Sequence, residues 1–97
     1  MSSDDRRAPS REAILAVHRF PGPYMIKAFG PAGPAFRASV VEHAHAVAGA
    51  AHVAVHERAT RSGDRVCVTL TLHVERVEDV EDMYARLYTL PDLLLIL

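Results

Sequence analysis

Apolar and polar residues alternate strictly along residues 65–75 of the chain. The apolar side chains occupy every second position, namely Val66, Val68, Leu70, Leu72 and Val74. Polar or small side chains stand between them, namely Arg65, Cys67, Thr69, Thr71, His73 and Glu75. Because successive side chains of a strand point to opposite faces, this period of two predicts a strand with one face buried.

A second, less regular alternation covers residues 52–60, just before the first. Between the two segments, Ser62-Gly63-Asp64 supplies residue types that favour a tight turn. The sequence therefore predicts an antiparallel hairpin. Its loop length predicts two pairs on the core face, Val55 with Leu70 and Val53 with Leu72.

Two other segments have the spacing of an amphipathic helix. The first begins at Pro34, which suits an opening turn, and ends at Gly49. Its apolar positions are Phe36, Val40, Ala44 and Val47. In the second, acidic residues crowd the early turns, where the helix dipole favours them, and Pro91 lies beyond the end. Its apolar positions are Val77, Val80, Tyr84 and Leu87.

The remaining segments are short. Residues 24–29 are apolar apart from one lysine and run into a turn rich in Gly and Pro, which predicts a strand. Residues 93–97 are apolar and predict a last strand. Ser10 can cap a short helix over residues 11–18. The polar residues 1–10 predict a flexible leader.

The order of these elements is β-α-β-β-α-β, which predicts an α+β protein of the ferredoxin-like type. In this fold a four-stranded antiparallel sheet carries two helices on one face. With 97 residues the chain suits one hydrophobic core, so residues 11–97 are expected to form a single domain. The other face of the sheet is predicted to lie open.

Apolar residues on that open face predict self-association. If every second residue of the last strand faces the helices, Leu94 and Ile96 point outward beside Met25 and Phe29. A contiguous apolar patch on a soluble domain usually marks an interaction site, so we expect a homodimer. The alternative is that the helix over residues 11–18, with its own apolar side chains, folds back and covers the patch.

Composition excludes several classes of function. The net charge is −1, which provides no field for binding a phosphate backbone, so no nucleic-acid partner is expected. Cys67 is the only cysteine, which excludes an intramolecular disulfide and a Cys-x-x-Cys redox pair and fits a cytoplasmic protein. No apolar run is long enough to cross a bilayer, so no membrane partner is expected.

The six histidines raise the question of a metal site. His43 and His45 point to different sides of a helix, since they are two residues apart. His52 and His56 share a strand face but lie about 13 Å apart. His52 can face His73 across the hairpin, yet a third ligand is missing. We therefore expect no metal and no cofactor.

Two motifs resemble those of a known family. Phe20-Pro21 followed by residues 24–30, Tyr-Met-Ile-Lys-Ala-Phe-Gly, is similar to the Phe-Pro-Ile-Lys-Val-Ile-Gly strand of the YbeD-like family. Residues 58–69 are similar to the Arg-x-Ser-x-x-Gly-x-Tyr-x-Ser-Val-Thr hairpin of the same family, whose members are small bacterial proteins of unknown function. That family resembles ACT regulatory domains, which bind small ligands at protomer interfaces. The resemblance implies a non-enzymatic regulatory or adaptor domain that binds a protein partner or a small ligand.

The matched positions give the candidate binding residues. They are Lys27, Gly30, Arg58 and Gly63. The two cations would contribute to an anion site beside the hairpin, where further arginines cluster. The alternative is that exposed arginines only solvate an edge hairpin and protect it from aggregation. Residues 30–34 lack the Asp that ACT domains commonly carry in this loop, so amino-acid sensing is not implied.

Two other functions occur with this topology, and each requires particular residues. An acylphosphatase-like hydrolase uses a loop followed by an Arg, and residues 33–37 show that order. However, the chain contains no asparagine to hold the attacking water, and its prolines remove amides from the loop. An RNA-recognition module stacks bases on aromatic side chains of the central strands, where Phe29 is the sole candidate. We therefore expect no catalytic residues and at most weak RNA binding.

Overall fold

The computed structural model describes residues 8–97. It contains three α-helices, α1 (Arg11–Val17), α2 (Pro34–Ala48) and α3 (Val77–Leu87), and a short 3-10 turn, Ala50–His52. The strands are β1 (Gly22–Pro31), β2 (Val53–Ala59), β3 (Arg65–Val74) and β4 (Leu95–Ile96). Of the predicted leader over residues 1–10, residues 1–7 lie outside the described residues, whereas Ala8 packs against the core and Ser10 caps α1.

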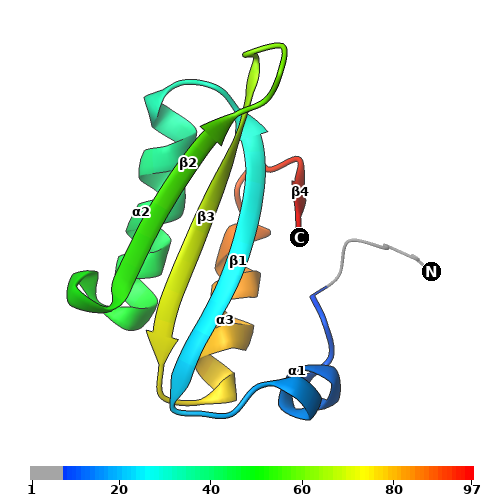
Figure 1. The fold of residues 1–97 in the computed structure, drawn as a ribbon, viewed down its shortest axis with the longest axis vertical. Helices are drawn as coiled ribbons and strands as arrows, with labels where there is room; N and C mark the ends of the chain where they lie inside the picture. Colours follow the sequence, from blue (N-terminus) through cyan, green and yellow to red (C-terminus); the bar gives the residue numbers. More distant parts are fainter. Residues whose placement is uncertain (1–7) are drawn as a thin grey trace.

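The four strands form one antiparallel sheet in the order β2-β3-β1-β4. Helices α2 and α3 lie together on one face of this sheet (Figure 1). The predicted ferredoxin-like β-α-β-β-α-β arrangement is therefore confirmed, with α1 as an addition before it. In the part of the chain that the structure describes, no helix is long and apolar enough to cross a membrane.

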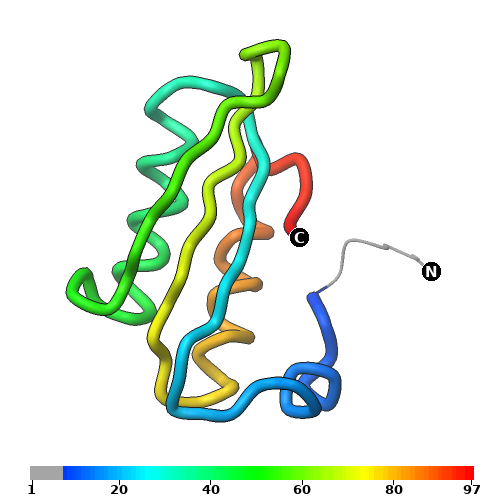
Figure 2. The backbone as a smooth tube through the Cα atoms, viewed as in Figure 1, coloured from blue at the N-terminus to red at the C-terminus, as the bar shows by residue number. Residues whose placement is uncertain are grey.

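The strict alternation of β3 builds the core. Its apolar residues are almost fully buried under the helices, together with Ile26 and Ala28 of β1. The β2–β3 register pairs Val55 with Leu70 and Val53 with Leu72, as predicted. The turn between these strands extends beyond the end of β1 (Figure 2), and Gly63 adopts a positive φ there of 81°.

A hydrogen bond between two tyrosines lies in this apolar layer. Tyr24 on β1 and Tyr84 on α3 place their hydroxyl oxygens 3.0 Å apart, and both side chains are buried. Burial raises the pKa of Tyr84 well above its usual value, and the hydrogen bond with Tyr24 raises it further. The Tyr84 hydroxyl is therefore kept protonated, and one of the two hydroxyls donates to the other.

Helix α1 is held against α3 rather than over the open face of the sheet. Ser10 caps it by accepting a hydrogen bond from the Ala13 amide, as predicted. Arg11 forms a two-pronged ion pair with Glu81, its Nη2 lying 2.6 Å from Oε1, and this contact lowers the pKa of the Glu81 carboxyl. Ile14 is buried in the core. The alternative in which α1 covers the patch around Met25 is therefore wrong, because Met25 stays 55% exposed.

The predicted orientation of the last strand is wrong by one residue. Strand β4 is only two residues long, and Ile96 pairs with Ala28, which faces the helices. Ile96 therefore packs against the core instead of facing outward. Hydrogen bonds fix this register, from the Leu94 amide to the Phe29 carbonyl at 2.8 Å and between Lys27 and Leu97 at 2.8 and 3.1 Å. Leu95 instead lies opposite Phe29, on the open face.

Candidate functional site

Two neighbouring rows of side chains cross the open face of the sheet. The strand registers place one row as Arg58, Cys67, Phe29 and Leu95, from β2 through β3 and β1 to β4. They place the next row as His56, Thr69, Lys27 and Leu97. Directly opposed residues of antiparallel strands point to the same side, so both rows face away from the helices.

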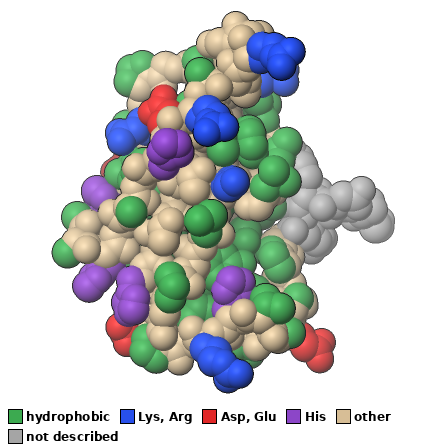
Figure 3. All heavy atoms as spheres, viewed as in Figure 1, with side chains coloured by type: hydrophobic (Ala, Val, Ile, Leu, Met, Phe, Trp, Pro, Cys, Tyr) green, Lys and Arg blue, Asp and Glu red, His purple; other side chains and the backbone are tan. Residues whose placement is uncertain are grey.

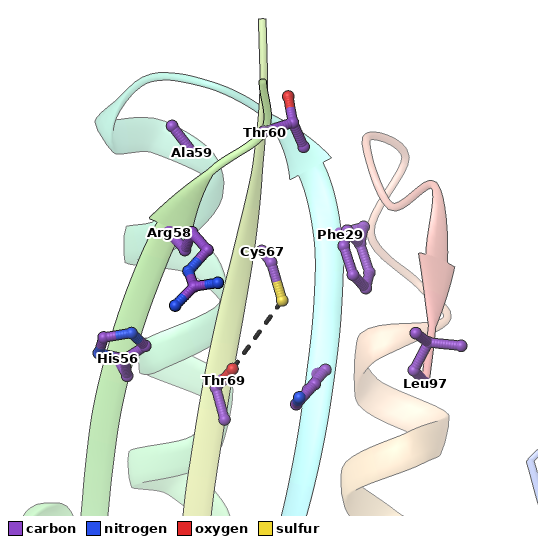
Figure 4. A pocket seen from close by; sticks show the side chains of 9 residues that line it. Phe29, His56, Arg58, Ala59, Thr60, Cys67, Thr69 and Leu97 are labelled. Carbon is purple, nitrogen blue, oxygen red and sulfur yellow. Dashed lines mark hydrogen bonds between the residues drawn. The ribbon is translucent and has the colours of Figure 1, made fainter. Parts of the chain in front are cut away.

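These rows line a concave pocket of about 360 Å³. Thr60 and Ala59 close its upper end, next to the turn between β2 and β3. In Figure 4, Arg58 extends its guanidinium towards the side of Cys67 and Thr69, while Phe29 and Leu97 lie towards β4. The pocket is therefore polar over β2 and β3, and over β1 and β4 it is apolar apart from Lys27.

Two cationic side chains line the pocket, and no acidic side chain does. The cations are Lys27 and Arg58. Glu57, the neighbour of Arg58 in the chain, lies on the helix side and binds Arg37 of α2 at 3.0 Å. Within residues 8–97, no ion pair involves Lys27 or Arg58. Figure 3 shows several blue Lys and Arg side chains over the upper half of the molecule, beside green apolar ones, and a further blue group at the lower edge.

Cys67 lies between Arg58 and Phe29 on the floor of the pocket and is half-buried. Its hydrogen-bond contact is the Thr69 hydroxyl, with 3.9 Å between sulfur and oxygen. His56 lines the same pocket but opposes Thr69 rather than Cys67. The thiol therefore has no histidine hydrogen-bonded to it among the described residues.

The two predicted glycines lie away from this pocket. Gly30 is buried on the helix side, and a Cβ added there would lie 2.6 Å from ring atoms of Phe36. Its lack of a side chain serves packing. Gly63 lies at the tip of the hairpin turn with no atom within 4 Å of an added Cβ. The structure thus brings together Lys27 and Arg58 of the four predicted binding residues, and leaves Gly30 and Gly63 outside.

The sequence model of a family described as "Protein of unknown function (DUF493)" matches residues 16–97. The chain belongs to this family. A search of curated proteins finds no match. The match covers both rows of the pocket and begins inside α1, so the open face is part of the shared DUF493 domain. The resemblance to YbeD-like and ACT domains stays a prediction.

Several pocket residues of this DUF493 domain were not among the binding residues predicted from the sequence. They are His56, Cys67, Thr69 and Leu97, and Leu95 lies beside them on the open face. The alternation of β3 places Cys67 and Thr69 on the open face, so their position could be read from the pattern. The two leucines could not, because only the hydrogen bonds of β4 decide which of its residues face outward.

Of the four predicted interface residues, three are exposed or on the open face. Met25 and Phe29 lie there through their pairing with Thr71 and Cys67. Leu94 is 42% exposed and borders a smaller hollow with Pro31 and Pro91. Ile96 is the exception described above, and Leu95 takes its place.

The histidines do not gather around a common point. The rings of His52 and His73 face each other across β2 and β3, with centroids 5.9 Å apart, as the sequence suggested. Among residues 8–97, no group of three or more His, Cys, Asp or Glu side chains has a metal-binding arrangement. This pair belongs to a separate hollow at the other end of the open face.

Proposed function

We propose that this DUF493 domain is a non-catalytic binding domain of the ACT-like kind. In this proposal it acts in the bacterial cytoplasm as a regulatory or adaptor domain, and its ligand or partner occupies the open face of the sheet. The supporting observation is the pocket in which Lys27 and Arg58 carry charge that no side chain of residues 8–97 neutralises. A charge left without a partner in a concave site favours an occupant of opposite sign.

The chemistry of the pocket supports binding rather than catalysis. A nucleophilic cysteine needs an adjacent base, and the hydrogen-bond contact of Cys67 is a hydroxyl. The loop over residues 33–37 is also a poor match to an acylphosphatase site. Arg37, its arginine, is engaged with Glu57 on the helix side, so it is not available to cradle a phosphate.

The proposal includes a homodimer that forms at the β1–β4 margin. Met25, Leu95 and Leu97 are exposed there by 55%, 39% and 71%. Large apolar side chains gathered at one margin favour association. Arg58 lies further towards β2, whereas Lys27 lies on β1 opposite Leu97, so a ligand that contacts both cations would bind close to the boundary between protomers.

The test uses Cys67 as a built-in reporter, because it is the only cysteine. Its alkylation by iodoacetamide is followed by intact mass, with and without the small-molecule fraction of a bacterial extract. We expect the extract to slow alkylation in the wild type and not in the Lys27→Met/Arg58→Met double variant. Arg61→Met, which removes a cation from the turn outside the pocket, is the matched control and should behave as wild type.

A parallel incubation with benzoyl phosphate tests the hydrolase alternative. We expect hydrolysis at the uncatalysed rate. Turnover that disappears in Arg37→Met would replace the proposal by the acylphosphatase-like alternative. Alkylation that no fraction slows, or that is slowed equally in the double variant, would refute binding at this pocket.

A further inference from the structure

The pocket has an internal polarity that narrows the chemistry of its occupant. Across the first row, the side chains change from the cation of Arg58 through a thiol to the aromatic ring of Phe29. Across the second, they change from an imidazole and a hydroxyl to the amine of Lys27 and then to Leu97. An occupant that matches this surface has one polar end and one apolar end.

The sign of the polar end follows from the charges. Arg58 and Lys27 project from β2 and β1 on either side of β3, with Thr69 between them in the adjoining row. Two cations that share a concave surface without an acidic side chain between them repel each other, and an anion between them removes that repulsion. Thr69 adds a hydroxyl donor at the same place. The polar end is therefore an anion that can accept several hydrogen bonds, such as a carboxylate or a phosphate.

The size of the pocket argues for a small molecule. About 360 Å³ lies near the lower end of the range of roughly 300–1,000 Å³ that is usual for small-ligand sites. A second copy of the chain is a poor occupant, because two open faces packed on each other would bring their cations together. The apolar end is best filled by a flat ring, which can stack on Phe29.

We propose that this pocket binds an amphipathic organic anion whose carboxylate or phosphate lies between Arg58 and Lys27 and whose flat apolar body lies on Phe29 and Leu97. The inference rests on the proposed function and gives it a ligand class. Arg58 and Lys27 neutralise the anion, Thr69 donates to it, and Phe29 recognises the body.

The experiment compares probes of one shape and different charge by their protection of Cys67 from iodoacetamide. The probes are naphthalene-2-carboxylate, 2-naphthyl phosphate, 2-naphthylmethanol and 2-naphthylmethylammonium, with acetate as an anion that lacks the apolar body. We expect the first two to slow alkylation in a saturable manner. The alcohol should require about tenfold or more higher concentration, because it lacks the charge-assisted hydrogen bonds. The ammonium and acetate should give no protection.

Variants locate the binding. Lys27→Met and Arg58→Met should each weaken naphthalene-2-carboxylate about tenfold or more. Phe29→Leu should weaken the binding of both naphthyl anions, and the site should still prefer them to the alcohol. Arg61→Met is again the control. Because these side chains are exposed or only partly buried, circular dichroism and a thermal melt of each variant should match the wild type.

Several results would overturn the inference. Equal protection by the alcohol and the anions would reduce the site to an apolar groove. Protection that survives in the Lys27→Met/Arg58→Met double variant would place the anion elsewhere. Protection by polyglutamate but by neither naphthyl anion would assign the surface to an acidic protein. If the cell extract protects Cys67 and the naphthyl anions do not, the ligand class is wrong while the proposed function stands; if neither protects, both fail.

Discussion

The two faces of the sheet are built from the same strands and differ in what constrains them. On the helix side, Val68, Leu70 and Leu72 of β3 are fully buried, and no charged side chain among the described residues is buried with the core. On the open side, Cys67 and Thr69 of the same strand oppose Lys27, His56 and Arg58. The first face is fixed by the removal of apolar surface from water. The second contributes little to that.

The largest expected effect comes from truncating the helix side. Leu70→Ala removes a fully buried side chain and should lower the free energy of unfolding by about 2–5 kcal/mol. Thr69→Ala, its neighbour on the open face, should change it by less than about 0.5 kcal/mol. Urea denaturation measures both. If Leu70→Ala leaves no folded protein, Ile26→Val provides a milder probe, with an expected loss of about 0.5–1.5 kcal/mol. Equal losses at positions 69 and 70 would break the contrast between the faces.

A smaller effect separates packing from binding at Gly30. Gly30→Ala should cost about 1–3 kcal/mol, because the new methyl group meets the ring of Phe36. Phe36→Leu should restore part of that loss in a double-mutant cycle. Gly63→Asn, which keeps the positive φ of the turn at low cost, should stay near wild type. A stable Gly30→Ala variant that binds the naphthyl anions less tightly would indicate that Gly30 belongs to the binding site after all.

An alkaline effect tests the one hydrogen bond between hydroxyls in the core. The pKa of Tyr84 is raised in the folded state, chiefly by burial, so folding favours its protonated form. The resulting stability is complete below the unfolded pKa of about 10 and is lost as pH rises from there towards the folded pKa. Wild type should therefore lose stability more steeply than Tyr84→Phe above about pH 10. Tyr24→Phe, which removes the hydrogen bond but not the burial, should fall between them. Equal pH slopes in urea titrations would contradict this assignment.

The smallest expected effect on stability comes from the apolar margin of the open face. Leu95→Lys should change the free energy of unfolding by less than about 0.5 kcal/mol while converting a dimer into a monomer. Light scattering over a dilution series measures the mass. Leu15→Lys, at an exposed leucine of α1, is the control and should remain dimeric. A wild type that stays monomeric at high concentration would contradict the proposed homodimer at this margin.

The contrast between the faces also explains what the sequence could predict. The period of two in β3 and the turn at Gly63 determine the hairpin and its register, because a slip of one residue would expose the whole apolar set. The two long helices follow from the spacing of their apolar residues, and Pro34 and Gly49 mark the two ends of α2. On the open face, the pattern placed Lys27 and Arg58 correctly. It could not show that Glu57 binds Arg37 and that Arg58 has no ion-pair partner among residues 8–97.

The remaining failures arise where one residue type has several explanations. Gly30 belongs to a recognisable motif, yet its reason is the ring of Phe36, which only the packed structure reveals. Residues 93–97 contain four leucines and one isoleucine, so no alternation of polarity sets the direction of each side chain. The start of α3 also depends on a contact that only the structure reveals. Its cap residue is Arg76, and the carboxylate of Asp79 accepts hydrogen bonds from the amides of Glu75 and Arg76 at 3.2 Å each.

The register of the sheet has a consequence for how the chain folds. Strands β2 and β3 are joined by a short turn and can pair as soon as the turn forms, whereas β1 must pair with β3 across the whole of α2 and β2. Closing the larger loop costs more chain entropy before any contact offsets it. We therefore expect the β2–β3 hairpin and its helix contacts to form early in the transition state, β1 to insert beside β3 afterwards, and the two residues of β4 to dock last. The pocket then exists only once folding is complete, because its floor is split between the early hairpin and the strands that arrive late.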